Sequence, residues 1–146
     1  MTNTIYDITH ESDAILLIGS NPEHAHPVLG MQVRQAVQRG AKLIVIDPRD
    51  IDVAKDADIH LKLKPGTNVA LINGLMNIII NEGLVNEEFI AERTENFEAL
   101  KEVVKDYTPD KVAKICGVDE DMLREAARIY ATVDKAPIMY CLGVTE

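Results

Sequence analysis

Residues 14–49 decide the fold, and they read AILLIGSNPEHAHPVLGMQVRQAVQRGAKLIVIDPR. Two short apolar runs stand out in this stretch, residues 14–18 and residues 42–46. The first run stops at Gly19, and the second stops at Asp47, which precedes a proline. Runs of this length that end at turn-forming residues predict β-strands, and their nearly continuous apolar character indicates burial on both faces.

Residues 28–39 predict a helix between these two strands. The apolar side chains that fall roughly on one face of this helix are Val28, Met31, Val33, Ala36 and Val37. Gly40 follows at the position where a helix commonly ends. A strand, a helix and a strand within about 30 residues form a βαβ unit, whose two strands pair in parallel.

Two more strands and a second long helix are predicted further along the chain. The strands are residues 59–63 and residues 138–142, and each is followed closely by a glycine. The helix is residues 69–81, with Thr67 or Asn68 as its N-terminal cap. This order of elements favours an α/β fold.

Residues 86–132 differ, because their helical spacing is interrupted near Asn96, Pro109 and Gly117. We interpret this segment as three or four short helices. The chain has no internal repeat and no linker, so residues 1–146 are predicted to form one domain with a helical elaboration at residues 86–132. The predicted fold class is α/β: a Rossmann-like, three-layer α/β/α domain with a mostly parallel sheet and this helical insertion.

The overall charge excludes several classes of partner. The chain carries 24 acidic and 15 basic residues, for a net charge of −9. Nucleic acids and anionic membrane surfaces both require clustered cations, so neither is an expected partner. No stretch approaches the ~20 apolar residues of a membrane-spanning helix, and the first residues carry no signal-peptide pattern. Cys116 and Cys141 lack a disulfide or metal spacing; we expect both in the core and the protein in a reducing, cytoplasmic setting.

The loop after the first predicted strand is the first candidate ligand site. In an open parallel sheet, ligands bind at the carboxyl ends of the strands, where successive loops converge. Gly19 lets the backbone approach a ligand, Ser20 and Asn21 offer polar side chains, and the following helix start offers N–H groups to an anion. The loop has neither a dinucleotide-type glycine motif nor a phosphate-binding lysine, so a polar turn with an asparagine cap is the alternative.

A second candidate loop, Asp47-Pro48-Arg49, follows the second predicted strand. Dinucleotide-binding folds place a ribose-binding carboxylate at this position, and an arginine beside it is suited to pair with a phosphate. The alternative is a strand terminator followed by a turn. We favour a binding role because two signals fall on the same edge of the sheet.

A third loop, with Gly66, Thr67 and Asn68, again lies between a strand and a helix start. These residues either cap the helix or present a hydroxyl and an amide to a purine, and the sequence leaves both roles open. His24 and His26 have no third ligand at a recognisable spacing, so no metal site is predicted. The sequence contains no Ser/His/Asp order and no acid–base pair, so no catalytic residue is predicted.

Several blocks of sequence have a familiar form. The first four blocks are IGSNP (18–22) with HP (26–27), GAKLIVIDPR (40–49), ADIHL (57–61) and KPGTNVAL (64–71). The later blocks are FIAERT (89–94), YTP (107–109) and GVT (143–145). Together they resemble, in the same order and over almost the whole chain, the large catalytic subunit of formate dehydrogenases in the molybdopterin oxidoreductase family.

In that family the matching loops hold one of two molybdopterin guanine dinucleotides. The residues that the resemblance implies for this cofactor are Gly19, Ser20, Asn21, Asp47, Pro48, Arg49, Gly66, Thr67, Asn68, Leu142, Gly143 and Glu146. The first loop would cradle the pyrophosphate, the second would reach the ribose and guanosine end, and the third would address the guanine. The C-terminal segment would approach the pterin, and the metal would be molybdenum or tungsten.

The chain departs from the usual pattern of the family at four positions, which are His24, Asn68, Leu142 and Glu146. The family's molybdenum-binding selenocysteine or cysteine, its neighbouring histidine and its iron–sulfur cluster cysteines match no residue of this chain. The resemblance therefore implies an internal fragment of a catalytic subunit that is inactive alone and binds no iron–sulfur cluster. Its expected partner is the remainder of that subunit, and its uncovered interface is a candidate for self-association.

Two other functions compete with this cofactor-binding role. A non-catalytic nucleotide-binding module, such as the central domain of thiamine-diphosphate enzymes, also has a Gly-Ser loop and an Asp-Pro after the second strand, although the later blocks do not fit it. A plain interaction domain would instead use the acidic helices of residues 86–132 as its surface. The first alternative predicts a preference for adenine nucleotides, and the second predicts no nucleotide binding.

Overall fold

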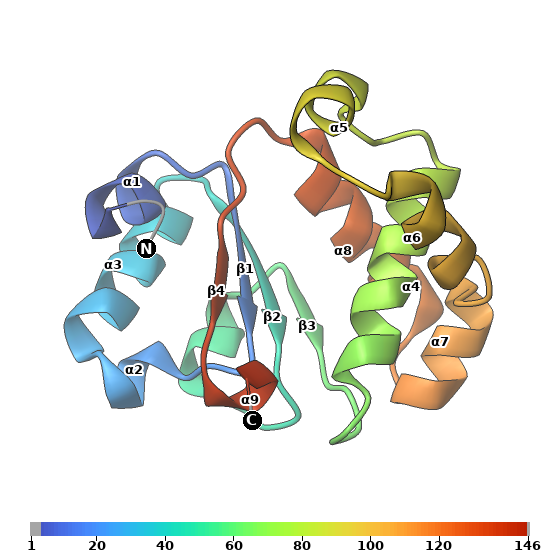
Figure 1. Ribbon diagram of the computed structural model, residues 1–146. Helices are drawn as coiled ribbons and strands as arrows, with labels where there is room; N and C mark the ends of the chain where they lie inside the picture. The colour runs from blue at the N-terminus through green and yellow to red at the C-terminus, as the bar shows by residue number, and fades with distance from the viewer. Residues whose placement is uncertain (1–3, 146) are drawn as a thin grey trace. The chain divides into compact units, whose positions relative to one another are not determined.

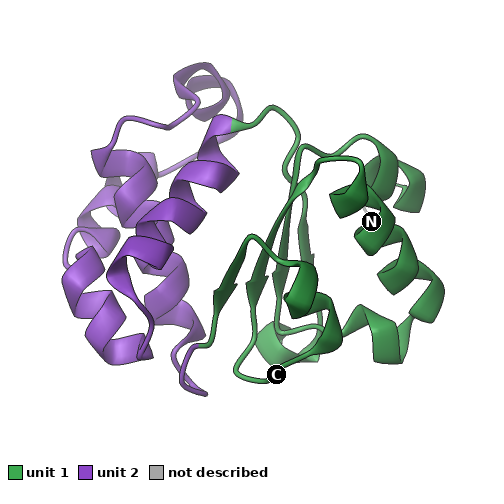
Figure 2. Ribbon diagram, turned by 180° about the vertical axis from the view of Figure 1, so that it is seen from behind, with its two compact units in different colours: residues 1–62, 133–146 green, residues 63–132 purple. Residues whose placement is uncertain are grey.

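The computed structural model describes residues 4–145, which form two compact units (Figure 1 and Figure 2). Unit 1 consists of the described residues of Met1–Lys62 and Val133–Glu146, and unit 2 is Leu63–Thr132. The chain therefore leaves unit 1 after the third strand and returns to it for the fourth. The helical elaboration expected at residues 86–132 falls within unit 2.

Unit 1 is built on a four-stranded sheet of order β3-β2-β1-β4, in which every neighbouring pair of strands is parallel. The strands are β1 (Ala14–Ile18), β2 (Lys42–Ile46), β3 (Ile59–Leu61) and β4 (Ile138–Tyr140). The helices of this unit are α1 (Ile5–His10), α2 (Pro22–Ala25), α3 (Pro27–Gln38), the 3-10 helix η1 (Asp52–Asp56) and α9 (Leu142–Thr145). The α/β class with a parallel sheet is confirmed.

The core of unit 1 lies between β1, β2 and helix α3. All five residues of β1 are buried, as the apolar run predicted. Alternate residues of a strand point to the same face of the sheet. Ile15 and Leu17 of β1 and Leu43 and Val45 of β2 therefore form one buried cluster on one face. Helix α3 contributes Val33 to this cluster. Burial of these branched side chains is the main force that holds the helix against the sheet.

The first two strands have the predicted bounds, whereas the third and fourth are shorter than predicted. The third strand ends at Leu61 instead of residue 63, because its partner β2 ends at Ile46, which pairs with Leu61. The fourth strand ends at Tyr140 instead of residue 142, because its partner Ile18 is the last residue of β1. A strand cannot continue its ladder where the neighbouring strand has turned away.

Two of the five residues that were predicted on the buried face of helix α3 are exposed instead. Val28 and Met31 are 66% and 52% exposed, while Gly30, Val33 and Ala36 are buried. At 3.6 residues per turn, Val28 and Met31 lie about 140° and 160° around the helix from Val33. The expectation that both face the core was therefore wrong.

Among the described residues, four short helices were not predicted: α1, α2, η1 and α9. Helix α1 has a capping box, in which the Asp7 backbone N–H donates to Thr4 Oγ1 at 3.1 Å and the Thr4 N–H donates to Asp7 Oδ2 at 2.9 Å. This spacing was visible in the sequence. Helices α2 and η1 are about one turn long, which is too short to show an apolar period.

Unit 2 consists of α4 (Asn68–Asn81), α5 (Glu87–Arg93), α6 (Phe97–Val104), α7 (Pro109–Cys116) and α8 (Glu120–Thr132). The prediction of three or four short helices after residue 86 is confirmed. Helix α4 contacts α6, α7 and α8. The buried Asn77 amide donates to the Val104 carbonyl at 2.9 Å, and Arg128 forms a two-point ion pair with Glu82. None of the helices in residues 4–145 is long and apolar enough to cross a lipid bilayer.

The contact between Gly74 of α4 and Val112 of α7 gives a stability prediction. A Cβ atom at position 74 would lie 2.8 Å from Val112 Cγ1. We expect Gly74→Ala to lower the free energy of unfolding by roughly 1 kcal/mol, because overpacking outweighs the higher helix propensity of alanine. Urea denaturation measures this change.

Val112→Ala supplies the matched background for the same measurement. Removal of the two Val112 methyl groups makes room for the new Cβ, so Gly74→Ala should become neutral or stabilising in that background. An equal loss of stability in both backgrounds would show that the two helices do not meet at this contact.

Candidate functional site

The candidate site in unit 1 lies at the carboxyl edge of the sheet. Because the four strands are parallel, the segments after β1, β2 and β4 all emerge at this edge. Two backbone hydrogen bonds connect them: the Gly19 N–H donates to the Ile46 carbonyl at 2.9 Å, and the Gly143 N–H donates to the Gly19 carbonyl at 3.2 Å. The structure therefore brings together the loops that start at Gly19, Asp47 and Leu142.

The contact between Gly19 and Gly143 is very close. A Cβ atom on Gly143 would lie 2.7 Å from both Cα and O of Gly19, and a Cβ atom on Gly19 would lie 2.8 Å from Gly143 C. Gly19 also has a φ of 55°, a left-handed conformation that glycine adopts without penalty. The glycine that was expected to let a ligand approach therefore lets a second backbone segment approach.

The loop after β1 contains a helix of its own. Helix α2 begins at Pro22, directly after Asn21, and a proline has no N–H to offer an anion. The long helix α3 begins only at Pro27, after this short helix. The Asn21 side chain makes no capping bond, and among the described residues its buried Oδ1 atom has no hydrogen-bond partner.

The loop after β2 holds a bidentate ion pair between its own residues. Asp47 is 1% exposed, and its Oδ1 accepts from both the backbone N–H and the Nε–H of Arg49, each at 2.9 Å. Its Oδ2 accepts from Arg49 Nη2 at 2.9 Å. The sequence placed these two residues at one edge but did not show that they bind each other.

A histidine that sequence reasoning missed supports this loop. His60 of β3 donates from Nε2 to the Asp47 carbonyl at 3.0 Å. Burial alone raises the pKa of Asp47, but the hydrogen bonds and charge of Arg49 outweigh it, so this pKa lies below its usual value. The alternation of apolar and polar residues in β3 is the sequence signal that could have found His60, because it predicts that this side chain lies outside the core.

The third predicted loop, with Gly66, Thr67 and Asn68, belongs to unit 2. Thr67 occupies the cap position of α4 without a capping bond; its hydroxyl donates instead to the Lys64 carbonyl at 2.6 Å. Of the two residues predicted as the cap, Thr67 or Asn68, the structure has Thr67 in the cap position. Gly66 has a φ of 84°, which a turn at this position requires.

The segment after β4 exposes most of its side chains. Leu142 is 60% exposed, and Cys141 is exposed and follows the strand, so its expected place in a core strand was wrong. The expected burial of Cys116 is confirmed. The predicted site residue Glu146 lies outside the described residues.

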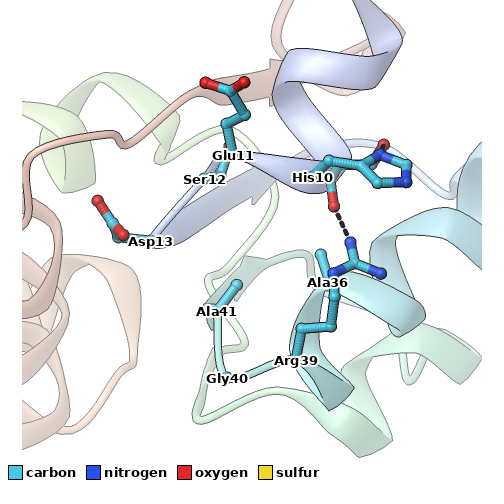
Figure 3. Close-up of a pocket in the computed structure, with 9 residues that line it drawn as sticks. His10, Glu11, Ser12, Asp13, Ala36, Arg39, Gly40 and Ala41 are labelled. Atoms are coloured by element: carbon cyan, nitrogen blue, oxygen red, sulfur yellow. Dashed lines mark hydrogen bonds between the residues drawn. The ribbon is translucent and has the colours of Figure 1, made fainter.

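A metal site is not found at this edge among the described residues. Among residues 4–145, no three His, Cys, Asp or Glu side chains are grouped closely enough to hold a metal ion. An open hollow of about 320 Å³ lies at the other edge, before β1 and β2, and is lined by Glu11, Asp13 and Arg39 among others (Figure 3). Arg39 donates there to the Thr9 carbonyl.

A sequence profile described as molybdopterin oxidoreductase matches residues 1–145. The chain belongs to this family. The molybdopterin oxidoreductase family includes proteins of several activities, and the relatives of this chain reflect that range, with formate dehydrogenases, nitrate reductases and acetylene hydratase among them.

Three members of the family illustrate the similarity. A formate dehydrogenase alpha subunit from Methanocaldococcus jannaschii is 52% identical over all of this chain and 22% of its own length. Formate dehydrogenase H from Escherichia coli is 42% identical over all of this chain and 20% of its own length. The structure of acetylene hydratase from Pelobacter acetylenicus matches with a TM-score of 0.84 and 40% identity, over 95% of this chain and 20% of that one.

This chain therefore spans about a fifth of the length of these relatives. The resemblance to the catalytic subunits of formate dehydrogenases is confirmed.

The glycine contact predicts a stability change at the site. Gly143→Ala should lower the free energy of unfolding by about 1–3 kcal/mol, because the new methyl group meets backbone atoms that cannot rotate away. Gly40→Ala is the control: it has a φ of 109° but open space around the new atom, so it reports strain without a clash. If Gly143→Ala unfolds at the same urea concentration as the unchanged chain, the two backbones do not touch.

The lowered pKa of Asp47 predicts a pH dependence. Its charged form is stabilised in the folded state, so this stabilisation is complete above the unfolded pKa, near 4, and is lost as pH falls through the folded pKa. Asp47→Asn should cost about 1–3 kcal/mol at neutral pH, and the difference from the unchanged chain should shrink below pH 4.

Urea denaturation between pH 7 and pH 3 measures this difference. In an Arg49→Gln background the carboxylate has lost its partner, so the effect of Asp47→Asn should be much smaller at neutral pH. An unchanged pH dependence in that background would contradict the assignment to this ion pair.

Proposed function

We propose that this chain binds the guanosine diphosphate part of a molybdopterin guanine dinucleotide, within the catalytic subunit of a formate-oxidising oxidoreductase. The observation that carries the proposal is the hydrogen-bonded meeting of three loops at the carboxyl edge of unit 1. The formate dehydrogenases among the most similar relatives support formate as the substrate of that oxidoreductase. When bound, the molybdenum or tungsten centre of such a cofactor supplies the two-electron chemistry, while the protein supplies orientation and electrostatics.

The strand order supports a nucleotide ligand. The order β3-β2-β1-β4 is that of the first four strands in dinucleotide-binding folds. In such sheets the ligand lies where the connections of neighbouring strands leave in opposite directions, and here that point falls between β1 and β4. Gly19 and Gly143 lie there, so a close contact between two backbone segments coincides with the expected ligand position.

Two polar groups of unit 1 fit a guanosine diphosphate. The buried Asn21 Oδ1 lacks a partner among the described residues, and a ribose hydroxyl or a ring N–H would satisfy it. An unsatisfied buried acceptor costs about 1–3 kcal/mol, so such a ligand would recover that energy. The outward N–H groups of Arg49 can pair with a phosphate.

The remaining positions follow the family resemblance. We propose that Ser20 lies near the diphosphate, that Gly66, Thr67 and Asn68 of unit 2 address the guanine, and that the segment after β4, from Leu142 through Gly143 toward Glu146, approaches the pterin. Pro48 lies between Asp47 and Arg49 in the loop after β2.

The proposed partner is the rest of a larger catalytic subunit. The edge strand β4 leaves Ile138 and Tyr140 more than half exposed, and Leu142 just beyond it is 60% exposed. Large apolar side chains grouped along an unpaired strand edge are typical of a surface that another chain segment covers. Self-association through the same edge is the alternative when no such segment is supplied.

Calorimetric titration of the 146-residue chain with guanosine diphosphate and adenosine diphosphate tests the proposal. We expect guanosine diphosphate to bind at least about tenfold more tightly, which corresponds to about 1.4 kcal/mol. Asn21→Ala should weaken this binding, while the exposed His24→Ala in the same segment serves as the matched control. Tighter binding of adenosine diphosphate would favour the thiamine-diphosphate type of module, and binding of neither nucleotide would favour an interaction domain.

A further inference from the structure

The carboxylate of Asp47 is fully engaged within the protein. Its Oδ1 accepts two hydrogen bonds from Arg49 and its Oδ2 accepts a third, all at 2.9 Å. The side chain is 1% exposed, so no ligand can reach the lone pair that Oδ2 retains. A ribose hydroxyl therefore finds no acceptor at the position where dinucleotide-binding folds usually provide one.

Arg49, in contrast, turns its free edge outward. Asp47 takes the Nε hydrogen and one Nη2 hydrogen, which leaves both Nη1 hydrogens and the other Nη2 hydrogen. The Arg49 side chain is 64% exposed, and among the described residues these remaining hydrogens have no partner. The loop after β2 thus presents the donors of Arg49 to a ligand, while the Asp47 carboxylate stays inaccessible.

The neighbouring charges allow an anion at this tip. Asp50, the next residue in the chain, forms an ion pair with Lys62, which follows β3. His60 is engaged with the Asp47 carbonyl through Nε2. Each carboxylate near Arg49 therefore has its own cation, and an incoming phosphate meets no unpaired negative side chain among them.

We propose that the tip of β2 receives a phosphate of the nucleotide through Arg49, and that Asp47 is a positioning residue that holds the guanidinium without touching the ligand. This inference rests on the proposed function and revises it, since the sequence assigned Asp47 to the ribose. The buried Oδ1 of Asn21 takes over as the acceptor for a ribose hydroxyl.

The ion pair gives this arrangement its energetic advantage. A free arginine side chain loses rotamer entropy when it is ordered against a ligand. Here the Nε and Nη2 bonds to Asp47 order the guanidinium during folding, so the ligand does not have to order it during binding. The planar guanidinium can donate to a carboxylate along one edge and to a phosphate along the other, because its N–H groups point outward on both sides.

Titration of the 146-residue chain with guanosine diphosphate and with guanosine separates the phosphate from the nucleoside. Arg49→Ala should weaken guanosine diphosphate binding about 10- to 100-fold and leave guanosine binding within about twofold. Asp47→Asn should weaken guanosine diphosphate binding about 3- to 10-fold. The double variant should bind no more weakly than Arg49→Ala alone, because Asp47 acts only through Arg49.

The matched controls lie at the opposite edge of the sheet. Asp58 accepts from Lys42 Nζ at 2.7 Å and from the Leu43 N–H at 2.9 Å, just before β3 begins. Arg39 donates to the Thr9 carbonyl before β2 begins. Asp58→Asn removes the charge of an ion pair and Arg39→Ala removes a hydrogen-bonded guanidinium, yet both should leave the affinity for guanosine diphosphate unchanged.

A measurement without ligand tests the positioning role even if Asp47→Asn folds poorly. The Nε–H of Arg49 should give a slowly exchanging resonance in the unchanged chain, since it is bonded to the buried carboxylate. Arg49→Lys keeps the charge but cannot bind Asp47 and a phosphate at two edges at once, so it should lose most of the affinity that Arg49→Ala loses.

Three results would overturn the proposal in distinguishable ways. Equal losses for guanosine and guanosine diphosphate in Arg49→Ala would place Arg49 on the nucleoside. Additive effects of Asp47→Asn and Arg49→Ala would mean that Asp47 contacts the ligand itself. Absence of binding to the unchanged chain would reject the proposed function, and this inference with it.

Discussion

The contact between the backbones of Gly19 and Gly143 is the constraint on which the ligand edge of unit 1 depends. It joins the end of the first strand to the segment after the last one, and a further hydrogen bond joins Gly19 to Ile46 at the end of β2. Three segments distant in sequence are thereby fixed at one edge. A side chain at either glycine would separate two of them, so the absence of side chains matters as much here as the polar groups that surround it.

Much of the fold follows from local patterns in the sequence. The bounds of β1 and β2 and the existence of α3 and α4 could be predicted, because apolar runs and periods report burial directly. The ends of β3 and β4 could not be predicted, because each strand ends where its partner ends, and pairing is not visible in one chain segment. Val28 and Met31 were wrongly assigned to the buried face of α3, because the five apolar residues of this helix do not all fit on one narrow face.

The candidate site shows a similar division. Topology alone brought the loops after β1 and β2 to one edge, and the structure connects them as parallel pairing requires. Contacts within one loop could not be predicted in the same way. Asp47 and Arg49 are separated by one residue, and the sequence assigned both to a ligand although they bind each other. Whether such a pair faces outward or closes on itself depends on burial of the carboxylate, which arises only when the sheet forms.

The order of segments along the chain has a consequence for biosynthesis. Strand β1 lies between β2 and β4, yet β4 is made only after the whole of Leu63–Thr132. While a ribosome extends the polypeptide, one edge of β1 therefore stays open until the final strand emerges, although its other edge can already pair with β2. Sheets closed by such distant segments fold slowly, and we expect the nascent chain to need protection from aggregation during this interval.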